Sequence, residues 1–329
     1  MLYHANKKMK KPIPEPKPLF TERMQDILKG EDFQKYLEIL KKEPVRSIRC
    51  NKLKITPSDL KKRLEKKSWK ITQPFKTHPE IMIVETILKP GELGRALEHL
   101  LGYYYIQELA SMLPVIALKP KEEDVVLDLC AAPGSKTTQI ASEMNNTGTI
   151  IANDPNMGRI KILASNTERC GVTNTIITKK DGYQLCDKLE REGIFFDKIL
   201  VDAPCSGEGT LRSSYKTYKM WNIKSVKNLS NIQKGLINSA IKLLKPNGEL
   251  IYSTCTHSPE ENEEIVNFVL TKFKNEIKIE KILLPVISRP GITKWQDKEY
   301  LEDVQHSCRI YPHDNNTEGF FLAKFRRIE

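Results

Sequence analysis

The sequence predicts an α/β protein with a doubly wound, mostly parallel sheet, preceded by a small basic α+β domain. The first observation is that apolar segments typical of strands alternate with helical segments between residues 103 and 273. This alternation is typical of a parallel sheet covered by helices on both faces. The second observation is that residues 1–100 hold nearly all of the excess positive charge.

The charge is distributed very unevenly along the chain. The net charge of the whole chain is +11. Residues 1–100 contain 23 Lys and Arg against 13 Asp and Glu, whereas the other residues contain 30 against 29. The densest basic run covers residues 61–70. Such a patch attracts phosphate backbones through counterion release, although a solvated Lys-rich helix face would have the same composition.

The N-terminal part is expected to fold separately from the large sheet. Its expected helices and strands cover residues 20–43 (helical), 47–54 (strand), 56–67 (helix) and 81–85 (strand). A basic β-α-β unit of this size is compatible with an RNA-binding module. We therefore expect a flexible basic tail over residues 1–20, an N-terminal α+β RNA-binding domain over 21–102, and the sheet domain over 103–329.

The sheet domain is expected to contain five parallel strands and a final pair of strands. The strands are expected at 125–130, 148–154, 175–178, 196–202, 249–254, 307–310 and 319–325. The intervening helices are expected at 135–144, 157–170, 183–192, 226–244 and 259–273. Each helix would connect two neighbouring strands, as in other open α/β sheets.

Composition excludes several other classes of protein. No apolar run reaches the length of about 18 residues that a membrane span requires. The seven cysteines are odd in number and widely spaced, and no CxxC pair occurs. A disulfide framework and a zinc site are therefore both disfavoured, and no metal site is expected. A reducing, cytoplasmic location is the better interpretation of free cysteines.

Three acidic residues follow successive strands of the expected sheet, namely Asp154, Asp181 and Asp202. Ligands of open α/β sheets bind at the carboxyl ends of the strands. The turn Ala131–Lys136 consists mostly of small residues, which let a ligand approach the backbone. It lacks the glycines of a dinucleotide site and the first glycine of a P-loop. A tight turn with a ribose-binding acid, Asp154, instead suits a methyltransferase cofactor site, although each acid alone could simply cap a helix.

Two cysteines follow adjacent strands of the expected sheet. Cys205 lies in Asp202-Ala-Pro-Cys205-Ser-Gly, and Cys255 lies in Ser253-Thr-Cys255-Thr. Adjacent strands would place both thiols beside one pocket. A cysteine in such a loop is a candidate nucleophile, whereas most buried cysteines are only small hydrophobic residues.

Several motifs together resemble the RsmB/NOP/Sun family of RNA cytosine-C5 methyltransferases, in particular its archaeal, tRNA-directed type. The matching segments are Ser47–Asn51, Gln107–Ser111, Asp128–Thr137, Asp202–Gly207, Tyr252–Thr256, Pro259–Glu263, Arg309–His313 and Gly319–Phe321. The resemblance covers about residues 46–326. One departure is Ser135, where the family often has a second glycine.

The resemblance implies a Rossmann-like sheet that is mostly parallel with an antiparallel last strand, and S-adenosyl-L-methionine as the cofactor. The cofactor-binding residues that it implies are Cys130, Ala131, Ala132, Pro133, Gly134, Ser135, Lys136, Asp154, Arg159, Asp181 and Asp202. It also implies that Cys255 is the nucleophile and that Cys205 assists product release. Asp202 and Lys136 would hold the target base and its developing charge.

The expected partner is RNA, with tRNA as the first choice and ribosomal RNA as the second, and the protein is expected to be a monomer without membrane contact. A DNA cytosine-C5 methyltransferase is an alternative, but that chemistry has no use for a second cysteine at Cys255. A non-catalytic RNA-binding factor is another alternative. The presence of Asp154, Asp202, Cys205 and Cys255 disfavours it.

Overall fold

The computed structural model describes residues 16–328. Most of the expected basic tail, including Lys7, Lys8, Lys10 and Lys11, lies outside the described residues. The last residues of that segment already belong to a helix, α1 (Pro18–Ile27). Within residues 16–328, no helix combines the length and the apolar character that are needed to cross a membrane.

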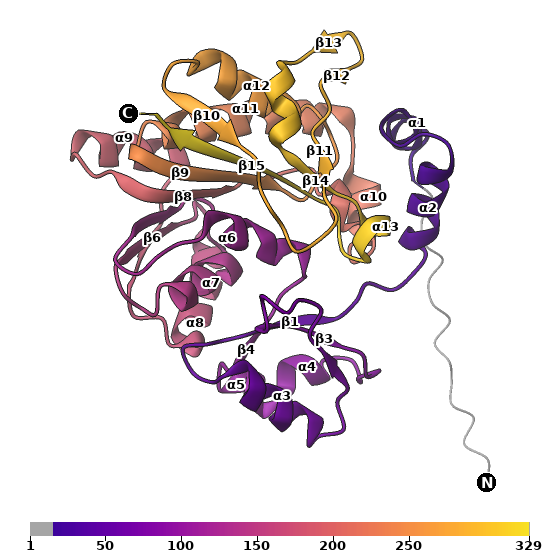
Figure 1. Cartoon of the computed structure of the whole chain (residues 1–329), viewed down its shortest axis with the longest axis vertical. Coiled ribbons are helices and arrows are strands. Elements are labelled where there is room, and N and C mark those ends of the chain that lie inside the picture. The colour runs from indigo at the N-terminus through magenta and orange to yellow at the C-terminus, as the bar shows by residue number, and fades with distance from the viewer. Residues whose placement is uncertain (1–15, 329) are drawn as a thin grey trace.

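The first two helices pack against the large sheet domain instead of the small sheet (Figure 1). Helix α1 and helix α2 (Glu31–Leu40) share an apolar cluster with Trp221, Val226 and Tyr311. Arg23 of α1 also forms a buried ion pair with Glu260, with 2.7 Å between the guanidinium nitrogen and the carboxylate oxygen. The described part of the chain thus begins on the large domain and crosses to the small sheet afterwards.

The small sheet is antiparallel, with strand order β2-β3-β1-β4. Its strands are β1 (Ser47–Cys50), β2 (Ile71–Thr72), β3 (Ile81–Val84) and β4 (Tyr104–Ile106). Its helices are α3 (Pro57–Glu65), α4 (Glu92–Arg95) and α5 (Leu97–Leu100). Thr56 caps α3 through a hydrogen bond from the Asp59 amide, and Pro57 suits the first turn of the helix. Strand β4 lies beyond residue 102 and still belongs to this sheet, while the expected domain boundaries stay predictions.

The large sheet confirms the predicted fold class. Five parallel strands run in the order β9-β8-β5-β6-β7, and β15 pairs antiparallel with β9. Strands β10, β11 and β14 extend this antiparallel side. The bounds are β5 (Val125–Asp128), β6 (Thr149–Asn153), β7 (Thr175–Thr178), β8 (Phe196–Asp202), β9 (Leu244–Thr254), β10 (Ile277–Glu280), β11 (Arg289–Pro290), β14 (Cys308–Ile310) and β15 (Phe320–Arg327). A separate hairpin pairs β12 (Lys294–Trp295) with β13 (Lys298–Glu299).

Helices cover both faces of the large sheet (Figure 1). One face carries α6 (Leu113–Leu118), α7 (Ser135–Glu143) and α8 (Met157–Cys170). The other carries α9 (Gly182–Arg191), α11 (Ile223–Ile241) and α12 (Glu263–Lys272). Val126 and Leu127 are both fully buried but belong to opposite apolar layers, because successive side chains of a strand point to opposite faces. Two short helices, α10 (Tyr215–Met220) and α13 (Pro312–Asn315), lie near α2.

One predicted helix begins later than expected. Helix α12 starts at Glu263, and the preceding residues 259–262 form a turn instead of the first helical turn. The side chains of Glu260, Glu261 and Asn262 are buried in this turn. They hold neighbouring loops in place, so these residues are not available as simple charges at a helix N-terminus.

Candidate functional site

The pairing of β8 with β9 brings the two candidate cysteines together. Asp202 lies opposite Ser253 in the parallel register, and the loops that follow leave the sheet side by side. The Cys205 and Cys255 Sγ atoms are 3.3 Å apart, and the Cys255 amide donates to the Cys205 sulfur. The two thiols therefore act as one hydrogen-bonded pair.

The two thiols differ in their surroundings. The hydrogen bond with Cys255, followed by burial, raises the pKa of Cys205 well above its ordinary value. Cys205 consequently keeps its proton at neutral pH, and a protonated thiol can donate to the neighbouring sulfur. Cys255, by contrast, lines a cavity of about 620 Å³. Its thiol can reach a ligand in that cavity.

Buried acidic side chains hold both cysteine loops. Glu261 accepts hydrogen bonds from the Ser206 amide and from Gln233. Glu208 accepts from the His257 amide, the Ser258 hydroxyl and the Trp221 indole. These bonds fix the backbone that follows each thiol.

Three other polar residues near the loops have structural contacts. Trp221 is buried and anchors its loop to Glu208. Arg212 is buried and donates to the carbonyls of Thr317 and Glu43. His257 is buried against Tyr311, and burial lowers its pKa to about 3, so it stays neutral.

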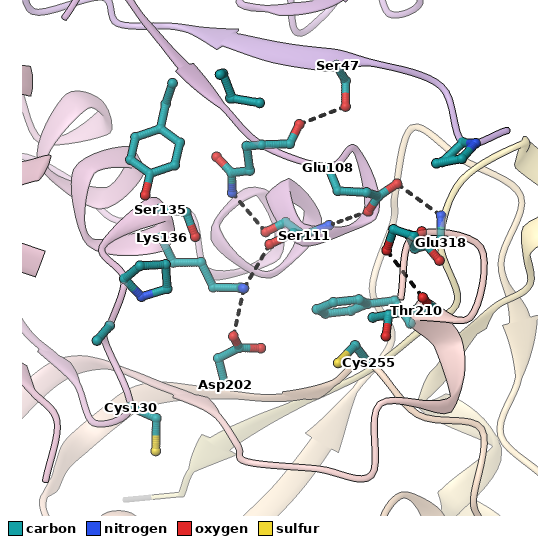
Figure 2. Close-up of a pocket in the computed structure, with 18 of the residues that line it drawn as sticks. Ser47, Glu108, Ser111, Cys130, Ser135, Lys136, Asp202, Thr210, Cys255 and Glu318 are labelled. Atoms are coloured by element: carbon teal, nitrogen blue, oxygen red, sulfur yellow. Dashed lines mark hydrogen bonds and ion pairs between the residues drawn. The ribbon is translucent and has the colours of Figure 1, made fainter. Parts of the chain in front are cut away.

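Lys136 and Asp202 form an ion pair on the wall of the same cavity (Figure 2). The Lys136 Nζ lies 2.7 Å from Asp202 Oδ2 and 2.9 Å from the Ser111 hydroxyl. Ser253 donates to the other oxygen of Asp202. The Lys136 ammonium also lies 5.5 Å from the centre of the Phe320 ring. The cation and the carboxylate are thus fixed beside Cys255 and can meet a polar ligand.

The turn after β5 has the geometry of a cofactor cradle. Cys130, Ala131, Ala132, Pro133, Ser135 and Lys136 all line the cavity. Gly134 has φ of +102°, and a Cβ atom there would lie 2.9 Å from a Leu163 methyl group. Glycine is therefore required for the turn that starts α7. Burial raises the pKa of Cys130 above its ordinary value, so this thiol remains neutral.

The three expected acids have different roles in the structure. Asp202 lines the cavity. Asp154 is fully buried at the end of β6 and forms an ion pair with Arg159, which also donates to the Ala132 carbonyl. Asp181 caps α9 by accepting from the amides of Tyr183 and Gln184. Asp154, Arg159 and Asp181 do not line the cavity itself.

The donor set nevertheless fits S-adenosyl-L-methionine. The cavity has the volume that small-molecule sites usually have. Asp154 is an acceptor at the end of the second parallel strand, where a ribose would be bound, and the adjacent turn is built of small residues. The cluster Asp32, His313 and Asp314 has metal-ligand spacing, but the Arg289 guanidinium already donates to the carboxylates of both aspartates, so oxygens that a metal ion would need are occupied.

Two glutamates of the cavity, the half-buried Glu108 and the buried Glu318, were not predicted from the sequence. Glu108 and Glu318 both line it, and burial raises the pKa of each carboxyl, in Glu318 to about 7. Glu108 lies within the Gln107–Ser111 motif, and Glu318 directly precedes the Gly319–Phe321 motif. The motifs thus indicated the right segments, but spacing alone could not show that these residues line the same cavity as Cys255.

Comparison with known proteins gives a consistent result. Residues 115–326 match the family of 16S rRNA methyltransferase RsmB/F, and residues 16–109 match the N-terminal domain of 16S rRNA methyltransferase RsmF. The tRNA (cytosine(49)-C(5))-methyltransferase of Pyrococcus abyssi is 41% identical over 93% of this chain and 95% of its own length. Ribosomal RNA small subunit methyltransferase F of Erwinia tasmaniensis is 38% identical over 94% of this chain, which spans only 63% of that relative.

Solved structures of similar proteins share the whole fold. A methyltransferase homologue from Pyrococcus horikoshii superposes with a TM-score of 0.81 at 34% identity, covering 94% of this chain and 95% of that one. NSun6 from Pyrococcus horikoshii with SFG superposes with a TM-score of 0.80 at 28% identity, covering 94% and 97%. Both superpositions include the small sheet as well as the large one.

Replacing Glu318 with Gln is expected to stabilise the ligand-free protein at high pH. The folded-state pKa of Glu318 is about 7, above its ordinary value of 4.5. The carboxyl therefore destabilises the folded state increasingly as the pH rises from the ordinary pKa to the folded-state pKa. Above pH 7 the gain in Glu318→Gln should reach roughly 3 kcal/mol, and it should disappear near pH 4.5. Urea unfolding of both proteins across this range measures the difference, and a gain that is independent of pH would contradict the assignment.

Proposed function

The chain belongs to the RsmB/F family of RNA cytosine-C5 methyltransferases, and we propose that it methylates carbon 5 of a cytosine in tRNA. Its methyl donor is S-adenosyl-L-methionine and its substrate is RNA. The choice of tRNA is supported by the tRNA-directed Pyrococcus abyssi relative, which matches this chain along 95% of its length. Ribosomal RNA is the second candidate, because residues 16–109 match the N-terminal domain of an rRNA methyltransferase.

The observation that carries the mechanism is the pair of thiols beside Lys136 and Asp202. Carbon 5 of cytosine is a poor nucleophile. Addition of the Cys255 thiolate to carbon 6 makes carbon 5 electron-rich, so that it can accept a methyl group, which the cofactor supplies. A base then removes the proton from carbon 5, the electron pair re-forms the ring double bond, and the sulfur leaves carbon 6.

Cys205 assists the last step as a hydrogen-bond donor. Its thiol is held 3.3 Å from the Cys255 sulfur and keeps its proton, because its pKa is raised. A hydrogen bond from Cys205 stabilises the negative charge that returns to the Cys255 sulfur as the bond to carbon 6 breaks. Cys205 is therefore the group that favours release of the product.

Lys136 and Asp202 hold the target base. The ammonium of Lys136 provides a donor and the carboxylate of Asp202 an acceptor, both fixed by Ser111 and Ser253. Preorganised charges of this kind stabilise charge that develops on a ring during addition. The cofactor would be held by residues 130–136, Asp154, Arg159, Asp181 and Asp202.

The small sheet domain provides the basic surface for RNA. Helix α3 and the turn that follows present Lys62, Lys66 and Lys70 to solvent, although Lys62 lies 4.0 Å from Asp59 and Lys70 pairs with Glu85 at the surface. Lys67 and Arg63 are paired with the buried Glu98, so only part of the basic run is available for phosphates. Phosphate contacts from this surface would position the RNA without reading its sequence.

The substrate is tested by bisulfite sequencing of total RNA from cells with and without this gene. We expect one or a few tRNA cytosines to lose their resistance to conversion when the gene is removed. Loss of resistance in ribosomal RNA only would favour the second candidate. Purified protein should also methylate tRNA in competition with duplex DNA, and preferential transfer to DNA would contradict the proposal.

Alanine variants distinguish the roles of the two cysteines. Each variant is incubated with RNA and S-adenosyl-L-methionine, and the products are resolved on denaturing gels. Cys205→Ala should accumulate a covalent protein–RNA complex, because release is slowed, whereas Cys255→Ala should form none. Cys186→Ala, a buried core position on α9, serves as the matched control and should turn over normally. A covalent complex with Cys255→Ala but not with Cys205→Ala would reverse the two roles.

A further inference from the structure

A chain of hydrogen bonds crosses the wall of the cavity from Asp202 to Glu318 (Figure 2). Lys136 links Asp202 to the Ser111 hydroxyl. The Ser111 amide donates to Glu108 over 3.2 Å, and the Glu318 amide donates to the other oxygen of Glu108 over 3.0 Å. The position of Glu318 is therefore fixed relative to the ion pair that would hold the base.

Glu318 is also fixed relative to the nucleophile. The amide of Gly319 donates to the Gly209 carbonyl, and the amide of Gly209 donates to the Cys255 carbonyl, both over 2.9 Å. A Cβ atom at Gly209 would lie 2.2 Å from the Gly319 carbonyl oxygen, so the two backbones touch. Glu318 thus has a fixed position, on the same cavity wall, relative to a nucleotide that Cys255 attacks.

The carboxylate of Glu318 lacks a firm partner. The residue is only 4% exposed, yet among the described residues no group makes a well-formed hydrogen bond to either carboxylate oxygen. Burial raises the pKa of this carboxyl, and weak hydrogen bonds from the Ser213 hydroxyl and amide lower it without preventing the net rise. The nearby guanidinium of Arg212 is occupied by Thr317, Glu43 and Asn316. Buried acceptors without donors are costly, so this carboxyl is suited to receive a donor from a ligand.

The chemistry of a nucleotide limits which donor that can be. Phosphate carries negative charge and no donor, so a carboxylate disfavours it. Within an RNA strand, a cytidine has hydrogen-bond donors only at its exocyclic amino group and at its ribose 2′-hydroxyl. The proposed function already assigns the polar edge of the base to Lys136 and Asp202. The 2′-hydroxyl is therefore the remaining donor of the target nucleotide.

On the basis of that proposed function, we infer that Glu318 accepts a hydrogen bond from the 2′-hydroxyl of the target cytidine and thereby selects RNA over DNA. The 2′-hydroxyl is the group by which a protein distinguishes the two at a single position. Glu318 is then a specificity-determining residue, while the chemistry at carbon 5 and carbon 6 depends on the cysteines.

The test compares two versions of the tRNA that the enzyme methylates, one with cytidine and one with a single 2′-deoxycytidine at the mapped target position. The wild-type enzyme should lose roughly ten- to hundredfold in kcat/KM on the deoxy substrate, as expected for a hydrogen bond to a charged acceptor. Glu318→Ala should lose a similar factor on the ribo substrate and little more on the deoxy substrate. Glu318→Gln keeps an acceptor oxygen and should retain part of the discrimination.

The outcomes distinguish the inference from the proposed function. If Glu318→Ala keeps the wild-type ratio between the two substrates, or if the wild-type enzyme does not discriminate, Glu318 does not read the sugar. If discrimination instead follows the identity of a flanking base, the carboxyl reads an amino group there and the inference is wrong. If the wild-type enzyme methylates no RNA, the proposed function fails first and the inference fails with it. Calorimetric binding of S-adenosyl-L-methionine should be unchanged in both variants, which shows that they are folded.

Discussion

The parallel pairing of β8 with β9 is the constraint on which the rest of the site depends. Its register sets Asp202 opposite Ser253 and leads the two following loops into contact. The distance of 3.3 Å between the thiols is a consequence of that register, so a shift by one residue would point Asp202 to the other face of the sheet. Catalytic groups on rigid strand ends need little further ordering when substrate binds.

Buried charges keep the loops beyond the strands in place. Glu263 forms a bidentate pair with Arg309, which also donates to the His257 carbonyl two residues after Cys255. Glu260 likewise pairs with Arg23 of α1. Buried pairs of this kind add little net stability, but removal of one partner leaves an uncompensated charge. Their effect here is to fix one conformation of the nucleophile loop, with α1 and β14 as supports.

The sequence was informative where chemistry and periodicity coincide. The five parallel strands, the turn at Gly134 and the cysteine loops were predicted because each follows from strand patterning and the residue types that the chemistry needs. Strands β2 and β4 were not predicted, because they are too short to show the alternation of apolar and polar residues that identifies a strand. The packing of α1 and α2 on the large domain was not predicted either, because it depends on contacts between residues far apart in the sequence. Burial is the other property that the sequence could not show: Trp221 and Arg212 lie inside the protein, and no local pattern indicates that Glu318 does.

The assignment of the nucleophile is tested most directly by reaction with a tRNA that carries 5-fluorocytosine at the target position. After methyl transfer, carbon 5 has no proton to remove, so the sulfur cannot leave and the adduct persists. Tandem mass spectrometry of the digested complex then identifies the modified cysteine. We expect the nucleotide to be attached to Cys255. Attachment to Cys205, or no adduct despite normal methylation of unmodified tRNA, would contradict this assignment.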